Sequence, residues 1–171
     1  MRTVKAFLGI GLLGLVSIVM ACIISPKTFT KTTYALVKLE FKDIPDFSST
    51  ALHHLSKGNN DSGYIIVDVR TPEEQNVSII ADAIDQASFE RNQADYQDQK
   101  IIVYCTIGYR SGFYTRSLRQ KGYEAYNLSE GILGWTHIKG RLLNPKGQTT
   151  TQVHAYSRPW NLGVKHYTAV F

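Results

Sequence analysis

Two short apolar segments constrain the fold of this chain more than any other feature of its sequence. Residues 64–69 (Tyr-Ile-Ile-Val-Asp-Val) and 101–104 (Ile-Ile-Val-Tyr) are rich in β-branched residues, which is typical of parallel strands buried on both faces. Thr71 and Pro72 follow the first segment and supply a helix cap and a first helical residue. A second helix is predicted over residues 111–121. Strands that alternate with helices predict a three-layer α/β fold, with helices flanking a central, mostly parallel sheet.

The α/β domain is predicted to extend over residues 44–143. A further apolar segment at 123–128 is expected to add a strand, and residues 48–57 and 130–139 are expected to form helices. In open parallel sheets, ligands bind beyond the carboxyl ends of the strands. Cys105 directly follows the second of the two apolar strands, so the fold places it at such an end.

Two regions flank this domain. Residues 25–43 begin with a stretch rich in Thr and Lys, up to residue 33, which predicts a spacer. A loosely alternating stretch follows at 35–41 and predicts an edge strand. Residues 144–171 form a C-terminal extension with several aromatic side chains. These aromatics are expected to pack back onto the domain, and recognition of a partner is the alternative.

The composition narrows the classes of function. With 171 residues, 43% of them apolar, the chain is long enough for one well-buried domain. Arg2 and Lys5 supply two of the net charge of +5, and the +3 that remains is spread among acidic residues, so no nucleic-acid partner is predicted. Two cysteines make no disulfide framework, and no His/Cys cluster has the spacing of a zinc site. We therefore predict no metal and no organic cofactor.

The first 24 residues are predicted to be a membrane anchor or signal segment. Residues 6–24 carry no charged side chain, and a helix of that length, about 28 Å, can just span a bilayer. Arg2 and Lys5 supply the basic start of an export signal, and Cys22 ends an approximate lipidation sequence. We expect an uncleaved or lipidated anchor that holds the domain at a bacterial inner membrane, facing the periplasm.

The segment from Cys105 to Ser111 carries the chemistry. A cysteine leaves a buried strand, a tight turn containing Gly108 follows, and Ser111 begins a helix whose unpaired N–H groups face the turn. Such a ring of amides stabilises a thiolate and makes the sulfur a competent nucleophile. Gly108 lets the backbone approach the sulfur, and Arg110 adds a permanent charge suited to oxyanions. An inert buried cysteine is the alternative, which the loop and helix disfavour.

Several motifs, in this order and at these distances, resemble the single-domain rhodanese family of sulfurtransferases. The matching segments are Asp68-Val-Arg70, Pro72-Glu-Glu74, Cys105-Thr-Ile-Gly-Tyr-Arg-Ser111, Gly122-Tyr123 and Glu130-Gly-Ile-Leu-Gly-Trp135. The likeness covers about residues 44–143 and is most specific in the cysteine loop. It implies the rhodanese fold, a central parallel sheet flanked by helices.

The resemblance also implies a sulfur-transfer cycle. Thiosulfate or a persulfide donor delivers sulfane sulfur to the catalytic Cys105, which becomes a persulfide, and a thiol or cyanide-like acceptor then removes the sulfur. Arg110 is implied to contact the small sulfur-containing anion. The residues implied to bind the substrate are Thr106, Ile107, Gly108, Tyr109 and Arg110. The residues implied to support the loop are Asp68, Arg70 and Ser111, of which the first two are equally well explained as an ion pair.

The chain departs from the family after the first helix. Where many relatives have His-Ile-Pro-Gly-Ala, residues 79–83 are Ile-Ile-Ala-Asp-Ala. This difference predicts altered loop geometry beside the site, which affects substrate preference more than activity, because the catalytic cysteine is untouched.

Two other functions stay open at the level of sequence. Phosphatases and arsenate reductases also place a thiolate and an arginine around a tetrahedral oxyanion. Their loops are one residue longer than the four residues that separate Cys105 from Arg110, and the shorter loop suits a single added sulfur atom better. The second alternative is a non-catalytic, membrane-tethered interaction module. The presence of Cys105 argues against it.

Overall fold

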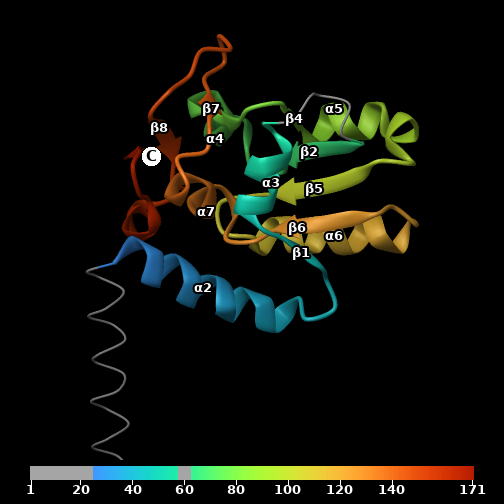
Figure 1. The fold of residues 1–171 in the computed structure, drawn as a ribbon, viewed down its shortest axis with the longest axis horizontal. Helices are drawn as coiled ribbons and strands as arrows, with labels where there is room; N and C mark the ends of the chain where they lie inside the picture. Colours follow the sequence, from blue (N-terminus) through green and yellow to red (C-terminus); the bar gives the residue numbers. More distant parts are fainter. Residues whose placement is uncertain (1–24, 58–62) are drawn as a thin grey trace, which may run out of the picture.

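The computed structural model describes residues 25–57 and 63–171 as a sheet with helices on both faces (Figure 1). The elements, in chain order, are α2 (Pro26–Glu40), β1 (Asp46–Phe47), α3 (Ser49–Leu55), β2 (Tyr64–Asp68), α4 (Pro72–Val77), β3 (Ile79–Ile80), β4 (Ala83–Asp85), α5 (Gln86–Arg91), the 3₁₀ helix η1 (Gln93–Tyr96), β5 (Lys100–Tyr104), α6 (Tyr109–Gln120), β6 (Ala125–Leu128), α7 (Gly131–His137), β7 (Leu142–Leu143), β8 (Gln152–His154), the 3₁₀ helix η2 (Arg158–Gly163) and β9 (Thr168–Val170).

The central sheet has five strands in the order β1-β6-β5-β2-β4, and all four neighbouring pairs are parallel. Its central strands are apolar on both faces. Ile66 and Ile102 pack on the face covered by α3 and α7, whereas Val67 and Val103 pack on the face covered by α5 and α6. The predicted three-layer α/β fold with a mostly parallel sheet is therefore confirmed.

The helix signals of the sequence place two helices beside the sheet edge that holds Cys105. Thr71 and Glu74 form a reciprocal capping box, so α4 begins at Pro72, directly after β2. The helix after β5 begins at Tyr109, two residues before the predicted start at Ser111. Gly108 explains this difference, because its left-handed backbone (φ +100°) turns the chain at once. Arg110 consequently belongs to the first turn of α6.

The prediction of a spacer and an edge strand over residues 25–43 is wrong, since this region forms helix α2. Ser25 caps the helix by accepting a hydrogen bond from the Thr28 N–H group, and Pro26 is its first residue. The buried side chains of Thr30, Tyr34 and Phe41 recur at helical spacing, which marks one face for packing. The β-branched threonines and the loose alternation of apolar and polar residues at 35–41 favour extended structure locally, so the helical spacing is not apparent in the sequence.

The C-terminal extension packs back onto the domain, as its aromatic residues predicted. Val153 is fully buried in the core, and β8 pairs with β9 in parallel. The extension also contacts α2 (Figure 1). Phe29 and Trp160 pack edge to face with ring centroids 6.1 Å apart. The Thr30 hydroxyl, which donates to the Pro26 carbonyl at 2.9 Å, also lies 3.2 Å from the Gly163 carbonyl oxygen. The two ends of the described chain therefore meet on one side of the sheet.

The predicted membrane anchor, residues 6–24, lies outside the described residues, as does Cys22. Within residues 25–57 and 63–171, no helix combines the length and apolar character that crossing a bilayer requires.

Candidate active site

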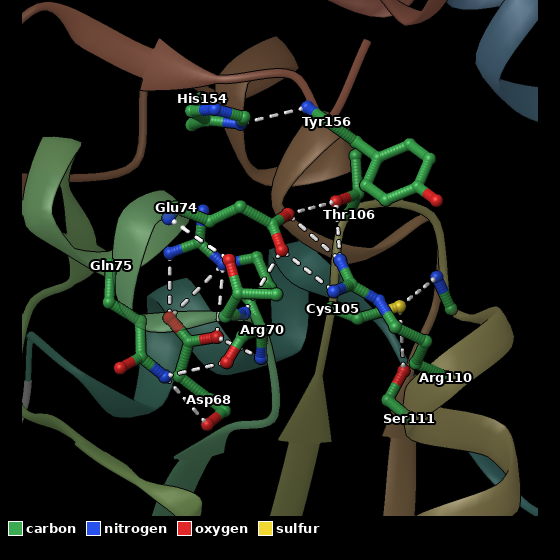
Figure 2. A network of polar contacts seen from close by, with 12 residues as sticks. Asp68, Arg70, Glu74, Gln75, Cys105, Thr106, Arg110, Ser111, His154 and Tyr156 are labelled. Carbon is green, nitrogen blue, oxygen red and sulfur yellow. Dashed lines mark hydrogen bonds and ion pairs between the residues drawn. The ribbon is translucent and has the colours of Figure 1, made fainter. Parts of the chain in front are cut away.

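Cys105 lies between the carboxyl end of β5 and the start of α6, the position that the sequence predicts for it. Its side chain is almost fully buried, with 1% of the residue exposed. The sulfur accepts a hydrogen bond from the backbone N–H of Gly108 at 3.2 Å (Figure 2). Of the ring of amides that the sequence predicts, one, that of Gly108, donates to the sulfur among the described residues. A developing thiolate is stabilised by such a donor.

A cavity of about 270 Å³ opens onto Cys105. Its walls come from the cysteine loop, from α2 and from the C-terminal extension, and the lining residues are Val37, Cys105, Thr106, Ile107, Tyr109, Arg110, Tyr156 and Trp160. Cys105 is therefore buried at the floor of a pocket that a small molecule can enter, which is the usual form of a substrate site.

The first turn of α7 supports the cysteine loop through backbone hydrogen bonds. The N–H groups of Ile132 and Leu133 donate to the carbonyl oxygens of Cys105 and Thr106, at 2.9 and 3.2 Å. Gly131 makes this approach possible, because a Cβ atom at that position would lie 2.4 Å from the Cys105 carbonyl oxygen. The glycine of the Glu-Gly motif thus has a structural reason beyond its left-handed backbone (φ +54°).

Asn127 and Tyr34 hold the other end of the loop. The Asn127 side-chain amide donates to the Gly108 carbonyl at 2.9 Å. The Tyr34 ring, from α2, packs so closely on Gly108 that an added Cβ atom would lie 2.6 Å from it. Tyr34 is itself fixed by a hydrogen bond from its hydroxyl to Asp46 at 2.7 Å. Helix α2 is therefore part of the site's support.

Ser111 lies between the sulfur and Asn127. Its hydroxyl oxygen is 3.4 Å from the Cys105 sulfur and 2.7 Å from the Asn127 side-chain carbonyl oxygen. A serine hydroxyl has one proton to donate, and the Asn127 oxygen accepts but cannot donate. The shorter contact takes that proton, so the Gly108 amide is the principal donor to the sulfur.

Arg110 forms a two-pronged ion pair with Glu74 of α4. The two terminal guanidinium nitrogens donate to the two Glu74 oxygens at 2.7 and 2.8 Å, and the Thr106 hydroxyl donates to the same carboxylate at 3.0 Å (Figure 2). Glu74 is 2% exposed. The guanidinium that the sequence assigned to an oxyanion substrate is thus already matched by a buried negative charge.

The ionisation of this pair follows from its contacts. Burial by itself would raise the pKa of Glu74, but hydrogen bonds from Arg110, Thr71 and Thr106 outweigh it and lower the pKa to about 2. Burial would also lower the pKa of Arg110, but its hydrogen bonds to Glu74 and the negative charge of that carboxylate raise the pKa above its usual value. Both groups are therefore charged at neutral pH.

Asp68 and Arg70 form a separate buried network at the end of β2. The expected ion pair is present, with Arg70 Nη2 donating to Asp68 Oδ2 at 2.6 Å. The Tyr104 hydroxyl donates to the same oxygen at 2.5 Å, and Arg70 Nη2 also donates to the Ser78 carbonyl at 2.6 Å. The network thus ties the end of β2 to the residue before Cys105 and to the chain after α4.

The remaining predicted residues divide between the loop's interior and its surface. Ile107 is buried against Tyr34 and Leu133, whereas Tyr109 is half exposed at the cavity wall. In the divergent segment 79–83, Asp82 has a left-handed backbone (φ +67°), a conformation that aspartate tolerates better than most residues.

The sequence did not reveal several contributors to the site, among them Tyr34 and Val37 of α2. Glu74 was visible only as part of the segment Pro72-Glu-Glu74, and Asn127, Tyr156 and Trp160 carried no local motif. Their roles depend on contacts between segments far apart in the chain, such as the 36 positions that separate Glu74 from Arg110. One signal in the sequence could have indicated the Glu74–Arg110 pair. An arginine in a buried loop needs a carboxylate partner.

Comparison with known proteins agrees with this geometry. The model of the rhodanese-like domain family matches residues 51–138, just over half of the chain. The chain therefore belongs to the rhodanese-like domain family. The cysteine loop, the Glu74 pair and the α7 contacts all lie within the matched residues, whereas α2 and the C-terminal extension lie outside them.

Two curated relatives and one solved structure are similar to parts of the chain. A tRNA sulfurtransferase from Desulfurococcus amylolyticus is 37% identical over 68 residues, 40% of this chain and 14% of the relative. A probable molybdopterin-synthase adenylyltransferase from Porphyra purpurea is 30% identical over 86 residues, 47% of this chain and 22% of the relative. The chain thus spans less than a quarter of either relative. A thiosulfate sulfurtransferase from Pseudomonas aeruginosa superposes with a TM-score of 0.55 at 25% identity, over 68% of this chain and 23% of that one.

Proposed function

We propose that the protein is a sulfurtransferase that carries sulfane sulfur as a persulfide on Cys105. The observation that carries the proposal is the position of the Cys105 sulfur, at the floor of a cavity of about 270 Å³ with the Gly108 amide directed at it at 3.2 Å. Membership of the rhodanese-like domain family and the sulfurtransferase among the relatives support the same chemistry.

The reaction divides into two displacements at sulfur. The Cys105 thiolate attacks the terminal sulfur of the donor, a new S–S bond forms to Cys105, and the S–S bond of the donor breaks, so that the leaving group departs with the electron pair. An acceptor thiolate or cyanide then attacks the terminal sulfur of the persulfide, and the Cys105 thiolate leaves. No external oxidant or reductant is needed. The Gly108 N–H stabilises the negative charge on the sulfur between the two steps.

The lining of the cavity does not favour the phosphatase alternative. Among the described residues that line it, none carries a carboxyl group, which is a common general acid for protonating the leaving group of a phosphate ester. Arg110 is also engaged by Glu74. We therefore expect negligible hydrolysis of p-nitrophenyl phosphate, and an interaction module without activity is the alternative that remains for experiment.

Intact-protein mass spectrometry tests the proposal. The full chain, reduced and then exposed to a sulfane-sulfur donor, is expected to gain the mass of one sulfur atom, and addition of cyanide is expected to remove it. Cys105→Ser should abolish the gain, whereas Cys22→Ser, which alters the only other cysteine, should retain it. If the wild-type chain gains no sulfur from any donor, the protein is not a sulfurtransferase of this kind.

The location of the domain stays a prediction from residues 1–24. We propose that residues 6–24 tether the chain to a bacterial inner membrane with the sulfur site facing the periplasm, because that segment has the length and lack of charge of a membrane span. Recovery of the full chain in the soluble fraction of cells would contradict the tether.

A further inference from the structure

We propose that the sulfane-sulfur donor of this site is an organic molecule with an apolar body, rather than the inorganic dianion thiosulfate. The inference rests on the proposed function and adds to it the chemical class of the donor. It is drawn from the walls and the charge of the cavity above Cys105.

The cavity walls are mainly apolar or aromatic. Val37, Ile107, Tyr109, Tyr156 and Trp160 line it beside the loop residues. Val37 belongs to α2, whereas Tyr156 and Trp160 belong to the C-terminal extension, so three of these five lie outside the residues that the family model matches. Such walls bind a hydrocarbon or aromatic group by removing its surface from water.

The charge of the cavity does not suit a dianion. Among the described lining residues, Arg110 is the single cation, and both of its terminal nitrogens are bound by Glu74. The pair leaves no uncompensated cationic side chain among the described residues that line the cavity. A doubly charged oxyanion would lose its hydration on entry and gain no unpaired cation, which is unfavourable in a buried site.

Tyr156 extends the apolar wall over the charged pair. Its ring lies over the Arg110 guanidinium, 5.3 Å from the ring centroid, and Figure 2 shows it beside Thr106. Its backbone is left-handed (φ +68°), and its N–H donates to His154 Nδ1 at 3.1 Å. A bulky residue in this conformation is strained unless its surroundings hold it. The surroundings of Tyr156 therefore hold its ring at the rim of the cavity at some cost in free energy. In this position the ring can contact the apolar body of a donor.

The transfer from such a donor balances without further reactants. For an organic thiosulfonate, the Cys105 thiolate attacks the terminal sulfur and forms the Cys105 persulfide. The S–S bond of the donor breaks, and the organic sulfinate leaves with the electron pair. An organic persulfide reacts in the same way, and its leaving group is the organic thiolate.

Three donors distinguish the contribution of the apolar body to the rate from the contribution of the charge. Benzenethiosulfonate and methanethiosulfonate are both monoanions with the same reactive group, and thiosulfate is the dianion. Each kcat/KM of the full chain is divided by the donor's rate with 2-mercaptoethanol, which removes intrinsic reactivity. We expect benzenethiosulfonate to exceed methanethiosulfonate at least about tenfold, since even one methylene in an apolar pocket is worth about that factor, and thiosulfate to be the poorest donor.

A variant pair tests the wall itself. Tyr156→Asn removes the ring and tolerates the left-handed backbone, and it is expected to lower the normalised value for benzenethiosulfonate about fivefold while methanethiosulfonate changes less than about twofold. Leu162→Ala, in the same extension but outside the cavity lining, is the control and should change neither. Thermal unfolding verifies that both variants fold.

The outcomes distinguish this inference from the function on which it rests. Persulfide formation with equal normalised values for all three donors, or with thiosulfate the best, would overturn the apolar-donor proposal and leave sulfur transfer intact. An unchanged donor preference in a folded Tyr156→Asn protein would remove the aromatic wall from the explanation. Absence of the persulfide with every donor would instead refute the sulfurtransferase proposal.

Discussion

The two sides of the cysteine loop are built in different ways. On one side of the sulfur, α7 and Asn127 donate hydrogen bonds to the loop, and the Glu74 carboxylate accepts one from Thr106. All of these residues lie within the part of the chain that matches the rhodanese-like domain family. On the other side, the cavity is covered by apolar side chains of α2 and the C-terminal extension. The hydrogen bonds that position the nucleophile thus belong to the family domain, to which α2 adds the packing of Tyr34 on Gly108. What reaches the nucleophile depends more on the segments added at the two ends of that domain.

The largest loss of stability is expected from Gly131→Ala, which disturbs the contact between α7 and the cysteine loop. The new Cβ atom would lie 2.4 Å from the Cys105 carbonyl oxygen, in a left-handed residue. Because backbone must move, we expect a loss of at least about 3 kcal/mol in the free energy of unfolding, measured by urea denaturation, and an equal fractional loss of sulfur transfer from every donor.

Gly147→Ala is the matched control for that change. Gly147 also has a left-handed backbone (φ +73°), but nothing lies within 4 Å of an added Cβ atom. It should cost only the conformational penalty, about 1 kcal/mol. Equal losses for the two variants would show that contact with the cysteine loop is not what Gly131 provides.

A smaller effect is expected from Glu74→Gln, which keeps a side chain able to cap α4 but removes the charge that pairs with Arg110. We expect a loss of about 2 to 3 kcal/mol in the free energy of unfolding. The freed guanidinium should also raise transfer from thiosulfate relative to benzenethiosulfonate. Glu73→Gln, on the exposed side of the same helix turn, is the control and should stay within about 0.5 kcal/mol.

The pH dependence of stability supplies a second measurement on the same pair. The pKa of Glu74 is lowered to about 2 from its ordinary value of 4.5, so its stabilising contribution is complete above about pH 4.5 and is lost as the pH falls toward 2. The gap in unfolding free energy between the wild type and Glu74→Gln should therefore narrow over that interval. A gap that is constant from pH 6 to pH 3 would contradict the assignment of the stability to this charge.

The smallest effect is expected from Ser111→Ala. The Ser111 hydroxyl donates to Asn127 rather than to the sulfur, so its removal should cost about 1 kcal/mol of stability and change sulfur transfer less than about threefold. Ser117→Ala serves as the control, since Ser117 lies in the same helix and, among the described residues, its hydroxyl bonds to the Tyr114 carbonyl alone. A loss of a hundredfold, typical of removing a donor that stabilises a reacting anion, would show that Ser111 serves the sulfur directly.

The sequence predicts the sheet and the nucleophile well because both depend on local patterns. The apolar strands at 64–69 and 101–104, the cap at Thr71 and the position of Cys105 each follow from neighbouring residues. The fold class was accordingly recovered, and the start of α6 was displaced by only two residues.

The walls of the cavity were not predictable in the same way. Helix α2 was taken for a spacer and a strand because its threonines favour extended structure locally, whereas its buried face at Thr30, Tyr34 and Phe41 gains stability only by tertiary packing. The segment Pro72-Glu-Glu74 marks a helix start, and nothing local indicates that Glu74 is the partner of Arg110. Tyr156 and Trp160 lie some 50 positions after Cys105, and no local pattern indicates that they return to it.

The meeting of α2 with the C-terminal extension has a consequence for the lifetime of the reactive sulfur. The edge-to-face packing of Phe29 on Trp160 holds an aromatic wall of the cavity at Cys105 in place. Bulky cellular disulfides exchange with thiolates in proportion to the exposure of the sulfur. A domain trimmed to the family boundaries would lose this wall and be inactivated sooner by mixed-disulfide formation with bulky disulfides.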